Sequence, residues 1–219
     1  MKEFLSILLL MLASCVIASG QGSQNQPAIK CMEDSPERRG EEGCTILANR
    51  PLLGPIKGVE YWHIDRFNSL EDATKAAGPN GVAAKAHRGV WLMTVEGKIQ
   101  DHHGGRHVAL IGPLVLPPAK EYTMKVRSTL LKQRSSTPVH AYSGPVVIYL
   151  VVGEQCLETE KAGHRLKAGK SFLLSGGTVH RGRIQSAGLR GALILVLHDS
   201  NLPASRDLTD DPPPLKPCR

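Results

Sequence analysis

The sequence has few aromatic residues and, beyond its first twenty positions, lacks long apolar runs. It contains two Trp, four Tyr and three Phe against 22 Gly and 15 Pro. This balance favours a turn-rich β protein and excludes coiled coils and helical repeats. No later stretch reaches the ~18 consecutive apolar residues of a membrane-spanning helix, so we expect no transmembrane anchor after that point.

The first twenty residues have the pattern of a signal peptide. A basic residue precedes an apolar run over positions 4–11, and small residues follow it. Positions 12–15 resemble the lipobox of bacterial lipoproteins, in which cleavage precedes the cysteine, here Cys15, and that cysteine is acylated. Cleavage after Gly20 is the alternative and would leave a soluble protein. We therefore expect an extracytoplasmic protein: either a periplasmic or membrane-anchored lipoprotein, held on the envelope membrane through Cys15, or a secreted protein.

No Cys-x-x-Cys pair occurs, which argues against a structural zinc site. Four cysteines follow the leader, at Cys31, Cys44, Cys156 and Cys218, and an even number in an exported chain is typical of disulfides. Cys31 and Cys44 flank a short polar segment, so we predict a disulfide between them, which contributes about 3 kcal/mol in the chain-entropy model. Pairing of Cys156 with Cys218 depends on whether the Pro-rich C-terminal segment folds back, and the sequence leaves this open.

Basic residues exceed acidic ones, 27 against 20. Positions 120–199 hold twelve basic and five acidic residues, which accounts for the whole net charge of +7. We expect no nucleic-acid partner, because the chain is predicted to be exported and its basic residues are not interleaved with exposed aromatics. A solvated strand face explains the excess, and attraction to an anionic envelope surface or to an acidic ligand is the alternative.

Composition divides the chain into four segments. These are a signal peptide (1–20), a polar tether that contains the Cys31–Cys44 loop (21–58), a folded domain (59–200) and a Pro-rich tail (201–219).

Within the domain, one short helix is expected between a cap at Asn68 or Ser69 and a stop at Gly78-Pro79. Strands are expected at 61–64, 90–95, 107–116, 122–131, 146–152, 156–159, 164–167, 171–174, 180–185 and 191–197. In the second half, turn residues recur about every eight to twelve positions, which is typical of an antiparallel sandwich or barrel.

Two stretches resemble the two motifs of the cupin family. Residues 138–154 read PVHAYSGPVVIYLVVGE and residues 169–180 read GKSFLLSGGTVH, within a resemblance that spans 135–198. Cupins are jelly-roll β-barrels, so the resemblance implies an all-β fold, similar to exported bacterial single-cupin proteins. Residues 59–118 are too few for a second barrel and should add flanking strands and the helix. A homodimer formed through the sheets, as in many cupins, is a further expectation.

The family's metal site takes two His and a Glu from the first motif and one His from the second. Here His140 and His180 stand at two of the His positions, whereas Tyr142 replaces the remaining His and Val146 replaces the Glu. A neutral phenol is a poor ligand and valine is none, so the resemblance implies at most a weak site for Fe, Mn, Ni, Cu or Zn at His140 and His180. The alternative is that His140, Tyr142 and His180 line a binding cavity as hydrogen-bonding side chains.

Two other groups of polar residues attract attention. The segment 102–107, with His102, His103 and His107, could supply a further metal ligand, but its two glycines favour an exposed loop. Glu154, Glu158 and Glu160 have even spacing, so we predict that they share one exposed face of a strand.

The sequence lacks the nucleophile elbow of serine hydrolases and the phosphate loop of nucleotide-binding enzymes. The leading hypothesis is small-molecule binding in the barrel, with an anionic ligand favoured by the surrounding Lys and Arg. One alternative is a metal-dependent cupin enzyme of the dioxygenase or isomerase type, and another is a non-catalytic envelope interaction protein. Loss of the anionic Glu ligand ranks binding above catalysis.

Overall fold

The computed structural model describes residues 31–33, 41–54, 56, 58–98, 104–208 and 210–218. Within these ranges the chain forms three β-sheets and one helix, so the predicted all-β fold class is confirmed. No helix in this part of the chain combines the length and the hydropathy needed to cross a membrane. The predicted signal peptide, with Cys15, lies outside the described residues.

Eight consecutive strands, β7 to β14, form the predicted jelly roll. Four of them lie in one sheet in the order β7-β14-β9-β12, and four lie in the other in the order β11-β10-β13-β8. This is the double Greek key of a jelly roll. The strands are β7 (Tyr122–Leu131), β8 (His140–Tyr142), β9 (Val146–Val152), β10 (Glu154–Thr159), β11 (Gly163–Lys167), β12 (Ser171–Leu174), β13 (His180–Ile184) and β14 (Arg190–Asp199).

Two strands that the sequence did not predict extend the first sheet to six strands. β2 (Gly43–Pro51) pairs antiparallel with β7, and β1 (Cys31–Glu33) pairs parallel with β2. The prediction of a polar tether over 21–58 is therefore wrong for residues 43–51. The reason is that the edge of β7 presents backbone N–H and C=O groups that need partners, and that Leu47 and Ala48 of β2 pack against the hydrophobic core between the sheets.

The C-terminal segment packs on the barrel, which answers the question that the sequence left open for the Pro-rich tail over 201–219. β15 (Ser205–Asp207) pairs with β8 and extends the second sheet to five strands. Further on, Lys216 forms a β-bridge with Thr159, and Cys218 forms a disulfide with Cys156. The predicted Cys31–Cys44 disulfide is confirmed. Two disulfides in one chain are typical of an oxidising compartment.

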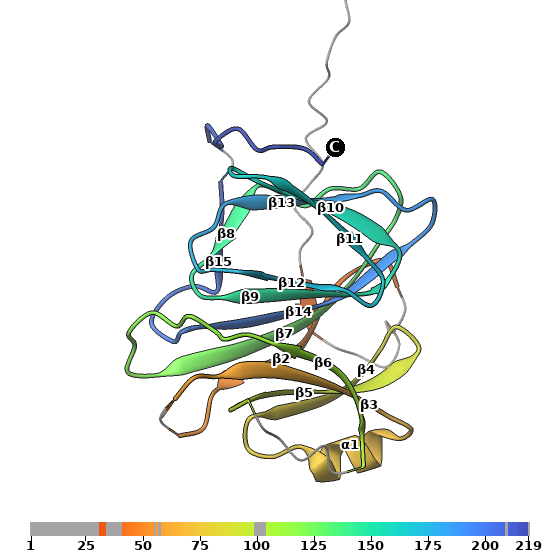
Figure 1. The fold of residues 1–219 in the computed structure, drawn as a ribbon, viewed down its shortest axis with the longest axis vertical. Coiled ribbons are helices and arrows are strands. Elements are labelled where there is room, and N and C mark those ends of the chain that lie inside the picture. Colours follow the sequence, from red (N-terminus) through yellow and green to blue (C-terminus); the bar gives the residue numbers. More distant parts are fainter. Residues whose placement is uncertain are drawn as a thin grey trace, which may run out of the picture.

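The region before the jelly roll forms a third sheet of four strands in the order β4-β5-β3-β6. Its strands are β3 (Tyr61–Phe67), β4 (Gly81–Ala86), β5 (Gly89–Glu96) and β6 (Arg106–Ile111). Figure 1 shows the three sheets as stacked layers, with the six-stranded sheet in the middle. The predicted strand at 107–116 ends at Ile111, before Gly112-Pro113, because proline cannot continue a ladder of backbone hydrogen bonds.

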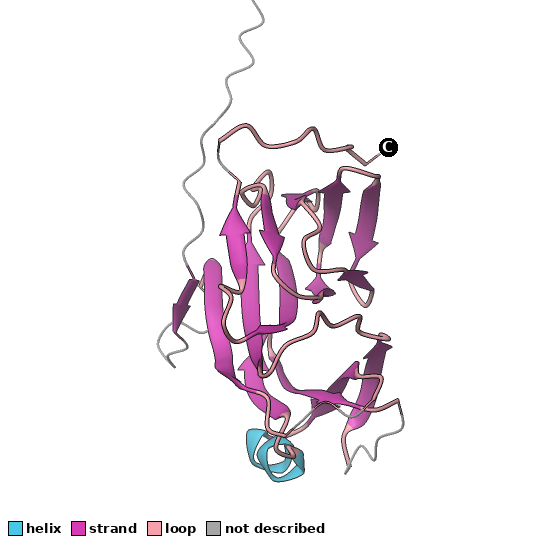
Figure 2. Ribbon diagram, turned by 90° about the vertical axis from the view of Figure 1, so that its left-hand side faces the viewer, coloured by secondary structure: helices cyan, strands magenta, loops and turns pink. Residues whose placement is uncertain are grey.

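The single helix, α1 (Leu70–Ala76), begins where the sequence predicted. Ser69 caps it by accepting a hydrogen bond from the Asp72 backbone N–H at 3.0 Å. Its buried residue Ala73 packs with Phe67 and Leu92 of the four-stranded sheet. The helix therefore lies at the end of the molecule away from the barrel (Figure 2).

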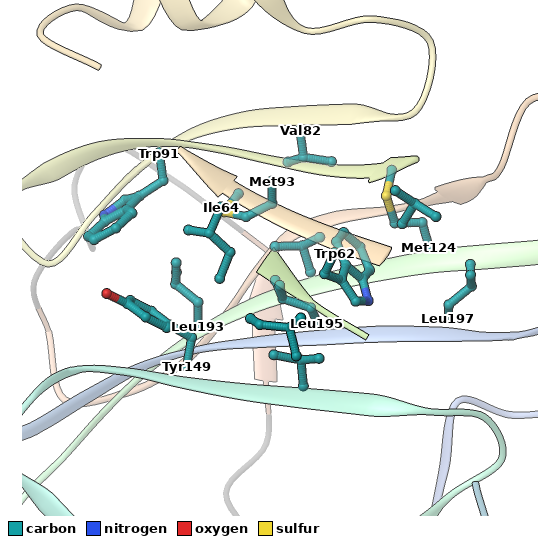
Figure 3. Close-up of a cluster of buried hydrophobic side chains, with 14 of the residues drawn as sticks. Trp62, Ile64, Val82, Trp91, Met93, Met124, Tyr149, Leu193, Leu195 and Leu197 are labelled. Carbon is teal, nitrogen blue, oxygen red and sulfur yellow. The ribbon is translucent and has the colours of Figure 1, made fainter. Parts of the chain in front are cut away.

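Hydrophobic cores lie on both faces of the six-stranded sheet. Alternate residues of β9 and β14, such as Ile148 and Ile194, point into the barrel, and their neighbours point toward the four-stranded sheet. This explains why both strands are apolar almost throughout, since each side of them is covered. Figure 3 shows the second core, which includes Trp62, Ile64, Val82, Trp91, Met93, Met124, Tyr149, Leu193, Leu195 and Leu197.

Candidate binding site in the barrel

The structure brings His140, Tyr142 and His180 together inside the jelly roll. His140 on β8 and His180 on β13 are direct register partners, and their ring centroids are 4.3 Å apart. Tyr142 stacks on His180 at 5.4 Å and meets the edge of His140 at 5.1 Å. The two motifs therefore place one aromatic cluster on the inner face of the five-stranded sheet.

Each histidine is oriented by a backbone carbonyl two residues before it. His140 Nδ1 lies 2.8 Å from the Pro138 carbonyl oxygen, and His180 Nδ1 lies 3.0 Å from that of Thr178. A carbonyl only accepts hydrogen bonds, so in both rings Nδ1 carries the hydrogen and Nε2 of the neutral ring is an acceptor. Neither Nε2 atom has a hydrogen-bond partner within the described part of the chain.

Burial keeps both imidazoles neutral at pH 7. The pKa of His180 falls to about 3, first because of burial and then because of the neighbouring His140. Burial also lowers the pKa of His140, and the positive charge of Arg127 lowers it further. Both causes disfavour an imidazolium ion in this cavity.

A cavity of about 260 Å³ opens beside the aromatic cluster. The inner faces of β7 and β14 contribute Arg127, Thr129 and Arg190 to its lining, and β10 contributes Gln155. The apolar part of the lining includes Leu131, Ile148, Leu157 and Ile194, and the Cys31–Cys44 disulfide lies at its edge. The site therefore combines a few polar groups with an apolar wall, as small-molecule sites do.

Several buried polar atoms in this lining have no partner. They are Nε of Arg190, Nε and Nη2 of Arg127, and both amide atoms of Gln155. Arg190 is 3% exposed and Gln155 is 1% exposed. Buried polar groups in proteins are nearly always hydrogen-bonded, so this concentration around one cavity indicates groups that await a ligand or water.

The donor set does not fit a firmly held divalent metal. Among the described residues, no three His, Cys, Asp or Glu side chains are placed to hold one ion. Val146, at the position of the family's Glu, is 1% exposed and offers no donor. Arg127 and Arg190 line the same cavity, and their charges repel a dication. Metal ligation by His140 and His180 stays a prediction that this set of side chains does not favour.

The other predicted ligands and the acidic strand face lie elsewhere. His102 and His103 are outside the described residues, whereas His107 is in β6, in the sheet on the far side of the six-stranded layer, with Nδ1 3.0 Å from Asp65 Oδ1. His107 therefore cannot complete a site with His140. The prediction of an exposed Glu158 is wrong, because its carboxylate is buried in ion pairs with Arg181 and Arg183.

A larger hollow of about 960 Å³ opens between the four-stranded and six-stranded sheets. There His87 Nε2 lies 3.0 Å from Ser128 Oγ and 3.2 Å from the Ala192 carbonyl oxygen. The contact with the carbonyl requires a hydrogen on Nε2, so this nitrogen is not free to take a proton from Ser128. Among the described residues that line it, the hollow therefore presents no activated serine, and the barrel cavity is the better candidate site.

Sequence reasoning missed Arg127, Arg190 and Gln155. The two arginines belong to the basic excess of positions 120–199, for which a solvated strand face is the first explanation from the sequence. In the structure Met124 and Val126 face the third sheet, and Arg127 and Thr129 face the cavity. The third sheet buries the outer face of β7, so the apolar residues on that face do not mark the interior of the barrel.

Comparisons with known proteins find similarity in solved structures alone: no protein family model and no curated protein matches this chain. A cupin-like protein from Thermotoga maritima has a TM-score of 0.36 and 15% identity over 39% of this chain and 64% of its own. The polyketide cyclase RemF from Streptomyces resistomycificus has a TM-score of 0.35 and 17% identity over 44% and 77%. DMSP lyase DddQ from Ruegeria pomeroyi has a TM-score of 0.35 and 20% identity over 39% and 43%. These similarities cover part of the chain and less than two thirds of the first and third proteins.

Proposed function

We propose that this cupin-type jelly-roll protein binds a small molecule in the barrel cavity, next to His140, Tyr142 and His180. The observation that carries the proposal is the set of buried, unpartnered polar atoms of Arg127, Arg190 and Gln155 around one cavity. Leaving such groups unpaired costs stability, and a ligand that pairs with them offsets that cost. No step of bond making or breaking follows from these side chains.

The cavity suits recognition better than metal-dependent catalysis. Its two imidazoles are neutral acceptors, its guanidiniums are donors, and its amide is both. These groups can orient a polar ligand, and the apolar wall of Ile148, Leu157 and Ile194 can cover the rest of it. A metal-dependent enzyme of this type needs a third ligand, and the one carboxylate among the described lining residues, Asp207, is exposed and is not placed with both histidines to hold one ion.

Gly182 offers a test of where ligands bind. It lines the cavity, and a Cβ built on it would have only ordinary contacts, the nearest being Gln155 Oε1 at 3.7 Å. Gly182→Leu should therefore fill the cavity without straining the backbone. We would screen carboxylates, alcohols, amides and amines of up to about nine non-hydrogen atoms by ligand-observed NMR, a size that matches the cavity volume at ~30 Å³ per water-sized group.

Compounds that bind the parent protein, lose affinity in Tyr142→Ala and fail to bind Gly182→Leu would support the proposal. If no compound binds, or if binding persists in Gly182→Leu, the cavity is not the binding site and the proposal is overturned. Metal analysis of untagged protein completes the test. Near-stoichiometric metal that is lost in both His140→Ala and His180→Ala would place the metal-dependent enzyme first.

We also propose that the protein is exported and lipidated at Cys15. The two disulfides support an oxidising location, and the lipobox-like sequence supports the anchor. Mass spectrometry of protein recovered from the producing cells would test this. A diacylglyceryl mass on Cys15 is the expected result, and a free amino terminus at Gln21 would overturn the lipid anchor while leaving secretion intact.

A further inference from the structure

We infer that the barrel cavity is a site for a small hydroxycarboxylate, with the carboxylate bound by Arg127 and Arg190 and the hydroxyl bound by the histidine pair. This inference rests on the proposed binding function and specifies the class of its ligand. It follows from the charges, hydrogen-bonding roles and size of the cavity.

Arg190 is a buried cation without a counter-ion. It is 3% exposed, its Nη1 donates to Thr129 Oγ1, and its Nε has no partner. It forms no ion pair with any described residue. A buried, unpaired charge costs stability, so its presence in a cavity indicates that an anion binds beside it.

Arg127 adds a second cation on the same side of the cavity. Its guanidinium lies over the Tyr142 ring, 5.0 Å from the centroid. Arg190 donates to Thr129, which lies two residues from Arg127 on the same face of β7. Arg127 Nη1 contacts Cys31 Sγ at 3.8 Å, while its Nε and Nη2 are buried and unpartnered. The two guanidiniums therefore line one cavity from neighbouring strands and leave several N–H groups free to bind an anion.

A carboxylate is the anion that these groups fit. Guanidinium forks bind carboxylates through paired N–H donors, and the Gln155 amide adds further donors. Asp207 is the carboxylate among the described lining residues, and it is exposed. The deep part of the cavity is therefore positively charged, which excludes cations as ligands.

The hydrogen-bonding roles of His140 and His180 indicate which chemical group the ligand carries besides its carboxylate. Each ring presents Nε2 as an acceptor, because Nδ1 donates to a carbonyl oxygen. The ligand must therefore bring a hydrogen-bond donor to this side. A hydroxyl meets the requirement, whereas an ammonium group would be repelled by the two guanidiniums.

Titration calorimetry with three matched compounds tests the inference. α-Hydroxyisocaproate has the carboxylate, the hydroxyl and an apolar body; isocaproate lacks the hydroxyl; and α-hydroxyisocaproamide lacks the charge. We expect the hydroxy acid to bind most tightly, isocaproate about 10-fold more weakly, and the amide about 100-fold more weakly. Inorganic phosphate, which has charge without an apolar body, is titrated beside them.

Three charge-removing variants locate the anion. Arg127→Gln and Arg190→Gln should each weaken binding of the hydroxy acid about 10- to 100-fold. Arg206→Gln is the matched control, because Arg206 lies on β15 but is exposed and outside the cavity lining. It should leave the affinity unchanged. The unliganded Arg190→Gln protein should melt no lower than the parent, because the substitution removes an unpaired buried charge.

The outcomes separate this inference from the binding function. If the amide binds as tightly as the hydroxy acid and Gly182→Leu abolishes both, the cavity binds small molecules and the carboxylate inference is overturned. The carboxylate inference also fails if phosphate binds more tightly than the hydroxy acid, if Arg206→Gln weakens binding as much as Arg190→Gln does, or if only amines and alcohols bind. Binding of the hydroxy acid that persists in Gly182→Leu overturns both proposals.

Discussion

The backbones of Gly144 and Gly176 touch, since a Cβ built on Gly176 would lie 3.0 Å from the Gly144 Cα. Gly144 belongs to the turn before β9, and Gly176 belongs to the turn between β12 and β13. The contact therefore joins the two motifs from which the barrel was predicted. A Cβ on Gly144 would also collide with the carbonyl oxygen of Leu197 and lie 2.9 Å from the His198 Cα.

We predict that Gly144→Ala prevents stable folding of the barrel. Its methyl group would collide with backbone atoms of β14, which cannot move without breaking the pairing of β14 with β7 and β9. The expected loss is about 4 kcal/mol or more of the free energy of unfolding, measured by urea denaturation. Gly188→Ala is the control, because a Cβ there meets no atom within 4 Å. Equal stability of the two variants would contradict the prediction.

A second prediction concerns the buried carboxylate of Glu158. It accepts hydrogen bonds from Arg181 Nε at 2.9 Å and Nη2 at 2.5 Å, and it forms an ion pair with Arg183, whose Nε lies 2.8 Å from its Oε1. We expect Glu158→Ala to lower the free energy of unfolding by about 2 kcal/mol, because it removes charge-assisted hydrogen bonds from a buried site. The expected loss is modest because both guanidiniums reach solvent.

Glu154→Ala serves as the control for Glu158. Glu154 is on the same face of β10 as Glu158, and its Oε1 lies 3.4 Å from Arg165 Nη1. Both side chains of this pair are more exposed to solvent than Glu158 is. Glu154→Ala should cost less than about 1 kcal/mol in the same urea experiment. A larger loss for Glu154→Ala than for Glu158→Ala would contradict our account of this face.

The jelly roll could be predicted because its motifs fix turns and strand spacing locally. β1 and β15 could not, because each has only three residues, and β2 could not, because its apolar residues are consecutive and do not alternate. All three form where an edge strand offers backbone partners. The burial of Glu158 was missed for a related reason: Arg181 and Arg183 come from β13, which pairs with β10 only in the folded sheet. Sequence periodicity contains no information about which strand covers a given side chain.

The candidate site also contains residues that the sequence predicted and residues that it missed. His140, Tyr142 and His180 could be named because they occupy motif positions. Arg127 and Arg190 could not, because their strands have interior residues on both faces and alternation no longer separates core from solvent. The two arginines can be identified only when it is known that the third sheet covers the outer face of β7, and this tertiary contact cannot be read from the sequence.

The disulfides give a third prediction. Cys156 and Cys218 are 62 residues apart, whereas Cys31 and Cys44 are 13 apart. In the chain-entropy model these loops contribute about 4 and about 3 kcal/mol. We therefore expect the double Cys156→Ser, Cys218→Ser variant to lose more stability than the double Cys31→Ser, Cys44→Ser variant, in urea melts of both proteins. The reverse order would show that native contacts, and not loop length, dominate.

The last prediction concerns pH. The pKa of His180 is about 3 in the folded protein, because of burial and the adjacent His140, against an ordinary value of 6.5 for a histidine side chain. Below pH 6.5 the unfolded chain therefore binds a proton at this position that the folded protein does not bind, so stability falls as the pH drops from about 6.5 toward 3. The full contribution of one such proton is about 1.4 kcal/mol per pH unit.

His180→Gln removes this contribution and should reduce the slope of unfolding free energy against pH by up to about 1.4 kcal/mol per unit between pH 4 and 6. Tyr142→Phe is the control, because it keeps the apolar ring beside His180 and leaves both imidazoles buried. It should retain the slope of the parent. Urea denaturation of the three proteins at several pH values measures the slopes directly. If His180→Gln and the parent have the same slope, His180 binds its proton equally well in the folded and unfolded states, and burial does not lower its pKa.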